Sequence, residues 1–226
     1  MKILIKFPTR GRPEQFIATL DKYMEYADGV IEYVITCDTN DETMNNPEMI
    51  AKLDSYIAFG KQLSYSFGES NSKIHAVNKD MEGRKFDILL LASDDMVPVK
   101  KGYDTIIRKA MAKLYPDTDG ILWFNEGFLA DQNNTLSILG KKYYDRFNYI
   151  YHPDYLSLWC DNEFTAVGNI LGKQTYIDIV IIEHQHVHYV GGKEDAIHIL
   201  NTEHHPIDRE TYRKRKLQWF PKESVL

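Results

Sequence analysis

An α/β fold built on a mostly parallel sheet is predicted by three features of the sequence. Short apolar runs alternate with segments whose apolar residues recur at helical spacing, which is the pattern of repeated strand–helix units. The run at residues 86–92 (FDILLLA) is apolar except for Asp87, as expected of a central strand covered on both faces. Loops rich in Gly, Pro, Asp and Asn separate these segments.

The first half of the chain supplies three strand–helix pairs. The strands are expected at residues 2–7, 30–37 and 63–67, and the helices at 14–27, 47–59 and 72–81. Pro13 is well placed near the start of the first helix, and Gly60 closes the second. The second strand, VIEYVITC, is rich in β-branched residues, which favour strands. This half therefore looks like a nucleotide-binding α/β unit.

The second half is less regular and is expected to complete the same sheet as a mixed extension. A helix is predicted at residues 103–114 and a charged helix at 209–216. Strands are predicted at 120–125 and 136–139, paired across Asn133-Asn134, and a further strand begins at residue 176 and ends in a polar, histidine-rich segment. No repeat or linker interrupts the chain, so we predict a single domain over residues 1–226.

Composition and charge narrow the functional classes. The chain has 226 residues, a net charge of -6 and a sequence pI of about 5.8, so it has no global attraction for nucleic acid or an anionic membrane. Its two cysteines, Cys37 and Cys160, form no CxxC pair, which favours a reducing compartment. No apolar stretch approaches the roughly 20 residues of a membrane span. We predict a soluble cytoplasmic protein, in the host cytoplasm if the chain is viral.

Polar residues follow three of the predicted strands directly. They are Thr9, Arg10 and Arg12, then Asp38, then Ser93, Asp94 and Asp95. Ligands of open parallel sheets bind outside the carboxyl ends of the strands, so these side chains are expected to share one site. Two adjacent carboxylates repel each other unless a cation neutralises them. Mg²⁺ or Mn²⁺ prefers such oxygen ligands and also bridges diphosphates.

A second group of candidate ligands is the histidine run at residues 183–188 (EHQHVH). In an extended segment His184, His186 and His188 point the same way and could bind a metal ion. Zinc is a competing interpretation, although no cysteine lies nearby. Residues 191–195 (GGKED) follow as either a lid with Lys193 near a phosphate or a surface turn. The RKRK run at 213–216 is either a solvated helix face or a patch for a polyanion such as DNA.

Four segments resemble, in order, motifs of the family 2 glycosyltransferases and related GT-A enzymes. FPTRGRP resembles the first loop beside the nucleoside, and CDTND the acidic turn whose Asp contacts the base. KIHAVN resembles the small-residue and Asn motif, and LLLASDDMVP the metal-binding DXD segment. These segments cover roughly the first 100 residues. The resemblance implies a GT-A type fold: a Rossmann-like, mostly parallel central sheet flanked by helices, with a mixed C-terminal extension.

The resemblance also implies a donor site and its metal. The implied nucleotide-binding residues are Pro8, Thr9, Arg10, Arg12, Asp38, Lys73, Asn78, Ser93 and Asp94. The usual first Asp of the DXD motif falls on Ala92 or Ser93 here. Mn²⁺ or Mg²⁺ is therefore expected on Asp94, with Asp95 as helper, and on either His186 or His184.

The second half is expected to bind the acceptor, in residues 101–226. WCDNEF (159–164) resembles the acidic motif that provides the catalytic base in inverting members. Asp161 is the expected base and Glu163 the alternative; whichever is not the base is expected to be a carboxylate at a helix N-terminus. The predicted function is metal-dependent transfer of a sugar, from a nucleoside-diphosphate sugar with UDP favoured, to an acceptor hydroxyl with inversion.

The acceptor and two rival functions stay open at this point. A glycan, a small molecule, a protein and a hydroxymethylated base in DNA are all candidate acceptors, the last because compact bacteriophage members of the superfamily resemble this chain in layout. A sugar nucleotidyltransferase would usually carry a Gly-rich loop after the first strand, where this chain has only Gly11. A non-catalytic nucleotide- or sugar-binding module is the third candidate.

Overall fold

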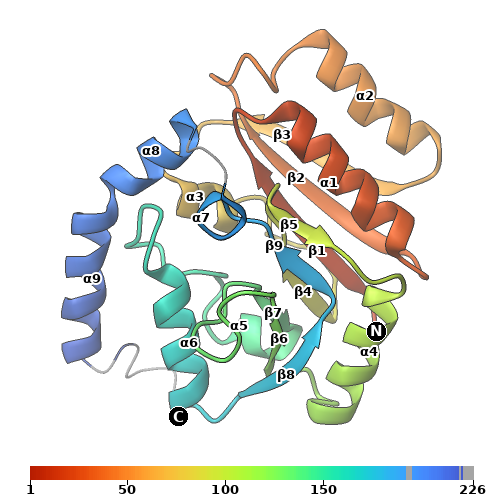
Figure 1. The fold of residues 1–226 in the computed structure, drawn as a ribbon. Coiled ribbons are helices and arrows are strands. Elements are labelled where there is room, and N and C mark those ends of the chain that lie inside the picture. The colour runs from red at the N-terminus through yellow and green to blue at the C-terminus, as the bar shows by residue number, and fades with distance from the viewer. Residues whose placement is uncertain (192–194, 219, 221–226) are drawn as a thin grey trace.

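The computed structural model describes residues 1–191, 195–218 and 220. Its centre is a seven-stranded sheet in the order β3-β2-β1-β4-β7-β6-β8 (Figure 1). These strands are β1 (Ile3–Thr9), β2 (Ile31–Asp38), β3 (Gln62–Gly68), β4 (Ile88–Leu91), β6 (Ile121–Asn125), β7 (Ile138–Gly140) and β8 (Gln174–Val180). A separate two-stranded sheet joins β5 (Met96–Pro98) to β9 (Ile182–His184).

The direction of the strands confirms the predicted mostly parallel sheet. β1 pairs in parallel with β2 and β4, and β2 with β3. β6 is parallel to β8, whereas β7 runs antiparallel to both β4 and β6. The predicted pairing of residues 120–125 with 136–139 is therefore found, but residues 126–137 connect the two strands instead of a tight turn. The carboxyl ends of β1, β2 and β4 lie at one edge of the sheet.

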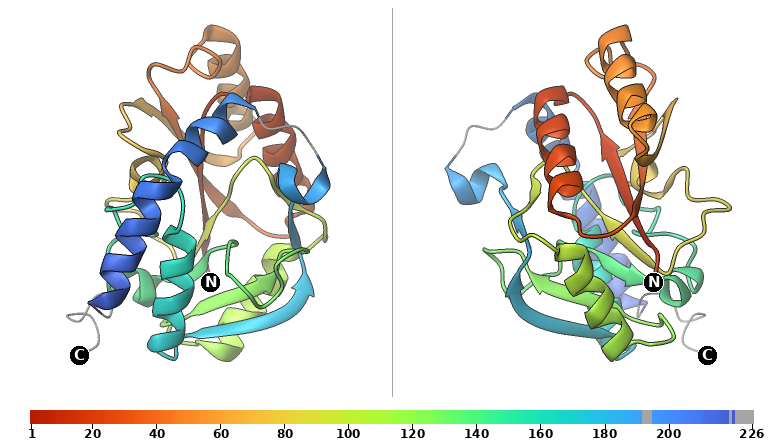
Figure 2. Two further views of the ribbon diagram at one scale, coloured as in Figure 1. Left: turned by 60° about the vertical axis from the view of Figure 1, so that its left-hand side comes forward. Right: turned by 90° about the vertical axis from the view of Figure 1, so that its right-hand side faces the viewer.

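Helices cover both faces of this sheet, as the alternating core residues of β1 require (Figure 2). Ile3, Ile5 and Phe7 pack in one hydrophobic cluster with α1 (Pro13–Tyr26), α2 (Pro47–Ala58) and α4 (Tyr103–Leu114). Leu4, on the opposite face, packs in a second cluster with α3 (Lys73–Asn78), α5 (Lys141–Asp145) and α6 (Cys160–Ile170). Successive strand residues point to opposite faces, so one strand serves both clusters.

Local signals explain where the helices of the first half begin and end. Pro13 and Pro47 occupy first-turn positions, where the missing amide costs nothing. The Asn46 side chain caps α2 by accepting from the Met49 amide at 3.0 Å. The predicted helix at 72–81 is shorter and ends at Asn78, because the following Lys79 is extended, with φ of -70° and ψ of 159°; Asp80 then has a left-handed conformation with φ of 62°.

The C-terminal segment forms α7 (Val187–Val190), α8 (Ala196–Glu203) and α9 (His205–Leu217). In Figure 1, α9 lies beside α6, and α8 continues toward the carboxyl ends of the central strands. The short helices α5, α7 and α8 were not predicted from the sequence. Among the described residues, no helix has both the length and the apolar character needed to cross a membrane.

Candidate functional site

The first part of the site lies where β1 and β2 end side by side, with Thr9 in register with Cys37. Thr9 and Asp38 are 7% and 8% exposed. Arg10 Nη1 donates to Asp38 Oδ2 at 2.5 Å and to Asn40 Oδ1 at 2.8 Å. In the described part of the chain, Thr9 Oγ1 and Asp38 Oδ1 are buried polar atoms without a hydrogen-bond partner. An unpaired buried polar group costs about 1–3 kcal/mol, so this corner suits a ligand with matching polar groups.

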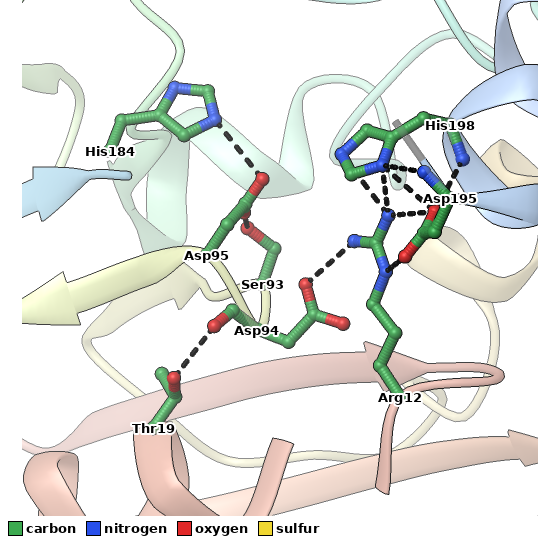
Figure 3. Close-up of polar contacts among 8 residues, drawn as sticks. All are labelled: Arg12, Thr19, Ser93, Asp94, Asp95, His184, Asp195 and His198. Atoms are coloured by element: carbon green, nitrogen blue, oxygen red, sulfur yellow. Dashed lines mark hydrogen bonds and ion pairs between the residues drawn. The ribbon is translucent and has the colours of Figure 1, made fainter. Parts of the chain in front are cut away.

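The second part lies where the chain turns from β4 into β5 (Figure 3). The Asp94 carboxylate accepts from Arg12 Nη1 at 3.1 Å, and its backbone carbonyl accepts from the Thr19 hydroxyl at 2.6 Å. Asp95 points away from Arg12, and its Oδ2 lies 3.5 Å from His184 Nε2. The two adjacent carboxylates therefore face different partners, which reduces their mutual repulsion.

Strand pairing determines which carboxylate meets a histidine. Met96 of β5 is in register with His184 of β9, and the Gln185 amide donates to the Asp95 carbonyl at 2.7 Å. Of the two metal ligands expected from the sequence, it is Asp95, the expected helper, that lies beside a candidate histidine ligand, whereas Asp94 lies beside Arg12. Asp94 is engaged by a cation from the first loop, whereas Asp95 faces the imidazole.

Asp95 and His184 fit the chemistry of a divalent metal site. Mg²⁺ and Mn²⁺ take carboxylate oxygens, and Mn²⁺ also takes imidazole. Neighbouring ligands of an octahedral ion with bonds near 2.1 Å lie about 3 Å apart, close to the 3.5 Å between these two donor atoms. Within the described residues, no three His, Cys, Asp or Glu side chains gather closely enough to hold a metal by themselves. An ion on this pair would complete its coordination with ligand and water oxygens.

The electrostatics of the two carboxylates differ accordingly. Burial raises the pKa of Asp94 above its usual value, with Arg12 opposing this effect and the neighbouring Asp95 charge adding to it. Burial also acts to raise the pKa of Asp95, but hydrogen bonding to His184 and to the Ser93 hydroxyl outweighs it and leaves that pKa well below its usual range. Asp95 is therefore ionised at neutral pH.

Arg12 joins the first loop to α8, 183 residues away in sequence (Figure 3). Its Nε and Nη2 donate to the two carboxylate oxygens of Asp195 at 2.7 and 2.8 Å, and Nη2 lies 2.8 Å from His198 Nδ1. The hydrogen bond from Arg12 holds the pKa of Asp195 below its usual range. Asp195 also caps α8 by accepting from the His198 amide at 2.9 Å. One guanidinium thus connects Asp94 to the C-terminal helices.

The third part of the site is the start of α6, where Asp161 lies in the first turn. Asn133 Nδ2 donates to its Oδ2 and the Asn162 amide to its Oδ1, both at 2.9 Å. Burial raises the pKa of Asp161 above its usual value. The exposed Lys73 at the start of α3 acts to lower the pKa of Asp161, Asp94 and Asp95 alike, so its charge favours the ionised form of all three carboxylates.

The backbone before α6 is held in an unusual conformation. Trp159 has a positive φ of 63°, which is strained for a bulky residue. The fully buried Asp208 of α9 accepts from the amides of residues 156, 157 and 158, each at 2.8 Å. These bonds fix the segment that leads into Asp161.

The structure gives three residues of the predicted site contacts or positions that the sequence did not indicate. Glu163, the alternative base, is 4% exposed and accepts two bonds of 2.7 Å from Arg215 and one of 2.7 Å from Tyr155, so it holds α9 to α6. The Asn78 side chain accepts from the amides of residues 150 and 151 and donates to the carbonyl of Tyr151, so it fastens a loop. Pro8 lies inside β1 instead of the following loop.

The histidines do not alternate along one strand as expected. His184 ends β9, His186 follows it, and His188 falls in α7. The rings of His184 and His186 are nevertheless 5.6 Å apart, and the ring of His186 is 5.1 Å from that of His198. The prediction that residues 191–195 form a lid falls largely on residues 192–194, which lie outside the described residues.

Several residues of the site were missed by sequence reasoning. They are Asn133, Thr135, Asp195 and His198, and each reaches the site through a contact between segments far apart in the chain. The only available signal was the Asp-x-x-His spacing of a helix cap at residues 195–198, which indicates a helix start but not its partner.

No protein-family model matches the sequence, and no curated protein does either. Solved structures do resemble the fold. TarS 1-349 from S. aureus in complex with UDP-GlcNAc has a TM-score of 0.64 and 14% identity, covering 88% of this chain and 60% of that one. The mannosyltransferase PcManGT from Pyrobaculum calidifontis, in complex with GDP-Man and Mn²⁺, has a TM-score of 0.62 and 14% identity, covering 79% and 55%.

A third similar structure is glucosyl-3-phosphoglycerate synthase from Mycobacterium tuberculosis in complex with Mn²⁺, UDP and phosphoglyceric acid. Its TM-score is 0.56 and its identity 9%, covering 84% of this chain and 73% of that one. The chain therefore has the GT-A fold of nucleotide-sugar glycosyltransferases, as the resemblance of its motifs implied. It spans only 55% and 60% of the lengths of the mannosyltransferase and TarS chains.

Proposed function

We propose that the protein transfers a sugar from a uridine-diphosphate sugar to an acceptor hydroxyl, with inversion and with a divalent metal. The observation that carries this proposal is the Asp95–His184 pair, which lies between β4 and β5 after the same edge of the sheet at which Thr9 and Asp38 form a buried polar corner. Ligands of a parallel sheet bind at this edge, and the similar structures were solved with UDP-GlcNAc, GDP-Man, UDP and Mn²⁺.

The polar corner supports uridine as the nucleoside. Uracil presents an imide N–H between two carbonyl groups. The unpaired Asp38 Oδ1 would accept from the N–H, and the Thr9 hydroxyl would donate to a neighbouring carbonyl. Guanine presents two adjacent donors and would need both carboxylate oxygens, but Arg10 already engages Oδ2. The arrangement therefore suits a base with one donor.

Asp161 is the proposed general base. Its carboxylate takes the proton of the acceptor hydroxyl while that oxygen attacks the anomeric carbon, and the bond from this carbon to the diphosphate breaks. The new bond forms on the face opposite the leaving group, so the configuration inverts. Burial raises the pKa of Asp161, which makes the carboxylate a stronger base.

The remaining groups would hold the donor. Asp95 and His184 would hold Mn²⁺ or Mg²⁺, which when bound supplies positive charge to neutralise the departing diphosphate. Lys73 adds a fixed positive charge near the same carboxylates. Arg12 stays beside Asp94 through its bonds to Asp195, which keeps α8 at the edge of the donor site.

Among the candidate acceptors, we place a glycan or another small hydroxyl compound ahead of a modified base in DNA. The basic run at residues 213–216 is partly neutralised within the protein. Arg215 is paired with Glu163, Arg213 and Lys214 share Glu210, and Lys216 lies over the Tyr212 ring at 5.7 Å. The net charge of the whole chain is -6, so a phosphate backbone is the less favoured partner.

Thermal unfolding with UDP, GDP, CDP and ADP, each with Mn²⁺ or with EDTA, tests the proposal. A ligand at a hundred times its Kd stabilises the native state by about 2.7 kcal/mol, which corresponds to a rise in Tm of roughly 5–10 °C for a chain of this size. We expect UDP with Mn²⁺ to give the largest rise, and EDTA to remove most of it. If no nucleotide changes the Tm with or without metal, the proposed function is wrong.

A further inference from the structure

Both reactive parts of the proposed site contact one connecting segment, residues 126–137 between β6 and β7. Asn133 Nδ2 donates to Asp161 Oδ2 at 2.9 Å. Two residues later, Thr135 Oγ1 lies 3.3 Å from His184 Nδ1. Asp161 belongs to the proposed base side of the site, whereas His184 faces Asp95 on the metal side. The same short stretch of chain therefore touches both.

The last part of this segment, residues 134–137, is buried in the fold, unlike an ordinary surface loop. Asn134 and Ser137 are fully buried, and Thr135 is 9% exposed. The Asn134 amide donates to Thr165 Oγ1 at 2.9 Å, which ties the segment to α6. Loops are normally exposed because their backbone groups need water, so a buried one satisfied by such bonds has a defined conformation.

The start of the segment is fixed as well. The Glu126 carboxylate, 1% exposed, accepts from the amides of residues 128 and 129 at 2.9 and 2.8 Å. The carbonyl of Glu126 accepts from the His184 amide at 2.9 Å, so the backbone of His184 is attached to the same segment as its ring. Both ends of the segment thus hold the position of His184.

The contact between Thr135 and His184 is important because the two nitrogens of the His184 ring face different partners. Nε2 faces Asp95, so it is the atom that would bind a metal, and the hydrogen of the imidazole then resides on Nδ1. Nδ1–H would donate to the Thr135 hydroxyl, which orients the ring. Removing a hydrogen-bond partner of this kind from a metal-binding histidine commonly lowers the metal affinity by about 10–100-fold.

We propose that Asn133 and Thr135 are positioning residues, through which one connecting segment aligns the proposed general base Asp161 with the metal-side ligand His184. This inference rests on the proposed function. Asn133 places the Asp161 carboxylate for the acceptor, and Thr135 places the imidazole for the ion beside the donor diphosphate. The distance between the two halves of the site is then set by the short stretch from residue 133 to residue 135.

Three variants test this inference: Asn133→Ala, Thr135→Val and, as a matched control in the same segment, the exposed Gln132→Ala. The metal arm measures Mn²⁺ affinity by calorimetry in the presence of UDP. Thr135→Val keeps the shape of the side chain but loses its hydroxyl, so we expect about a tenfold weaker affinity. Asn133→Ala and Gln132→Ala should bind Mn²⁺ as the unmodified protein does.

The base arm measures the pKa of Asp161 by carboxyl ¹³C NMR, with its signal assigned by its loss in Asp161→Asn. A hydrogen bond to the ionised form favours ionisation, so Asn133→Ala should raise this pKa. The other groups that act on Asp161 are Lys73 of α3, Tyr151 and Cys160, and all three are unchanged in the variants. UDP-sugar hydrolysis, with water as the acceptor, gives a second measurement. The acid limb of its pH–rate profile should move to higher pH in Asn133→Ala.

The outcomes separate the inference from the proposed function. If Thr135→Val binds Mn²⁺ normally, or if Asn133→Ala leaves the Asp161 pKa unchanged, the positioning roles are wrong even when the unmodified protein binds UDP and Mn²⁺. If the unmodified protein binds neither, the proposed function fails instead. Asn133→Ser, which keeps a small polar side chain, replaces Asn133→Ala if the latter does not show cooperative thermal unfolding.

Discussion

The two halves of the molecule build their parts of the site in different ways. In the first half, Thr9 and Asp38 end β1 and β2, and Asp95 directly precedes β5, so backbone pairing in the sheets sets their positions. In the second half, Asp161 and its neighbours are set by side-chain bonds between segments far apart in sequence. Sheet topology therefore determines where a ligand lies, and irregular segments determine how the reactive groups are oriented.

The largest expected effect lies in the second half. Replacing Asp161 by Asn removes the proposed base but keeps the size of the side chain. We expect kcat to fall by about 10²–10⁴-fold, because general-base catalysis contributes that much, with UDP affinity unchanged. UDP-sugar turnover and calorimetry measure the two quantities. The matched control is Glu163→Gln, and the folded fraction of this variant should keep the kcat of the unmodified protein. If Glu163→Gln loses as much kcat as Asp161→Asn does, the base would be reassigned.

The second prediction concerns stability in the same half. Arg215→Met leaves the buried Glu163 carboxylate without its cation, so we expect the free energy of unfolding to fall by about 3–5 kcal/mol. The double variant Glu163→Gln/Arg215→Met removes both charges and keeps an acceptor for Tyr155, and it should recover most of that loss. Urea unfolding measures both.

A surface pair gives the comparison for this experiment. Lys142 and Asp117 have side chains that are 59% and 57% exposed, so Lys142→Ala should leave the free energy of unfolding nearly unchanged. An equal loss in Arg215→Met and Lys142→Ala would show that the Glu163 pair is not a special attachment of α9.

The third prediction concerns the first half, where Lys6 is fully buried in β1 and donates to Thr36 Oγ1. Burial lowers the pKa of Lys6 from 10.5 to about 8. Between these values the unfolded chain binds more protons than the folded one, so the free energy of unfolding should rise with pH across this window. The rise attributable to Lys6 is up to about 3 kcal/mol.

Lys6→Met isolates this contribution because it lacks the titrating group. Urea unfolding at pH 7, 8, 9 and 10 should show the unmodified protein gaining stability relative to the variant as pH rises. Parallel pH profiles for the two proteins would contradict the lowered pKa of Lys6.

The smallest expected effect distinguishes the two carboxylates after β4. Asp95→Asn should weaken UDP affinity in Mn²⁺ by about 10-fold or more and leave the affinity in EDTA unchanged, because Asp95 faces His184. Asp94→Asn should affect both conditions alike, since it alters the contact with Arg12. The opposite result would restore the order of ligands expected from the sequence.

The fold was largely predictable because its signals are local. The parallel strands carry apolar runs, and Pro13 and Pro47 mark helix starts. The pairing of Asp95 with His184 was not predictable, because it depends on the register of two three-residue strands. The contacts of Glu163 and Asn78 could not be predicted either. The sequence does not show whether a carboxylate or amide in a motif will contact a ligand or another part of the protein. Here Glu163 binds an Arg side chain and Asn78 binds backbone groups.

Asp208 has a consequence for any shortened version of this protein. Its carboxylate accepts hydrogen bonds from three backbone amides of the segment before α6. Arg215 lies seven residues later on the same helix, α9, and binds Glu163 of α6. A fragment that stopped at residue 203 would retain all seven strands of the central sheet and every residue of the donor corner. It would nevertheless lose the bonds that hold the segment before Asp161, so an expression boundary drawn from sheet topology alone would leave the proposed base without this support.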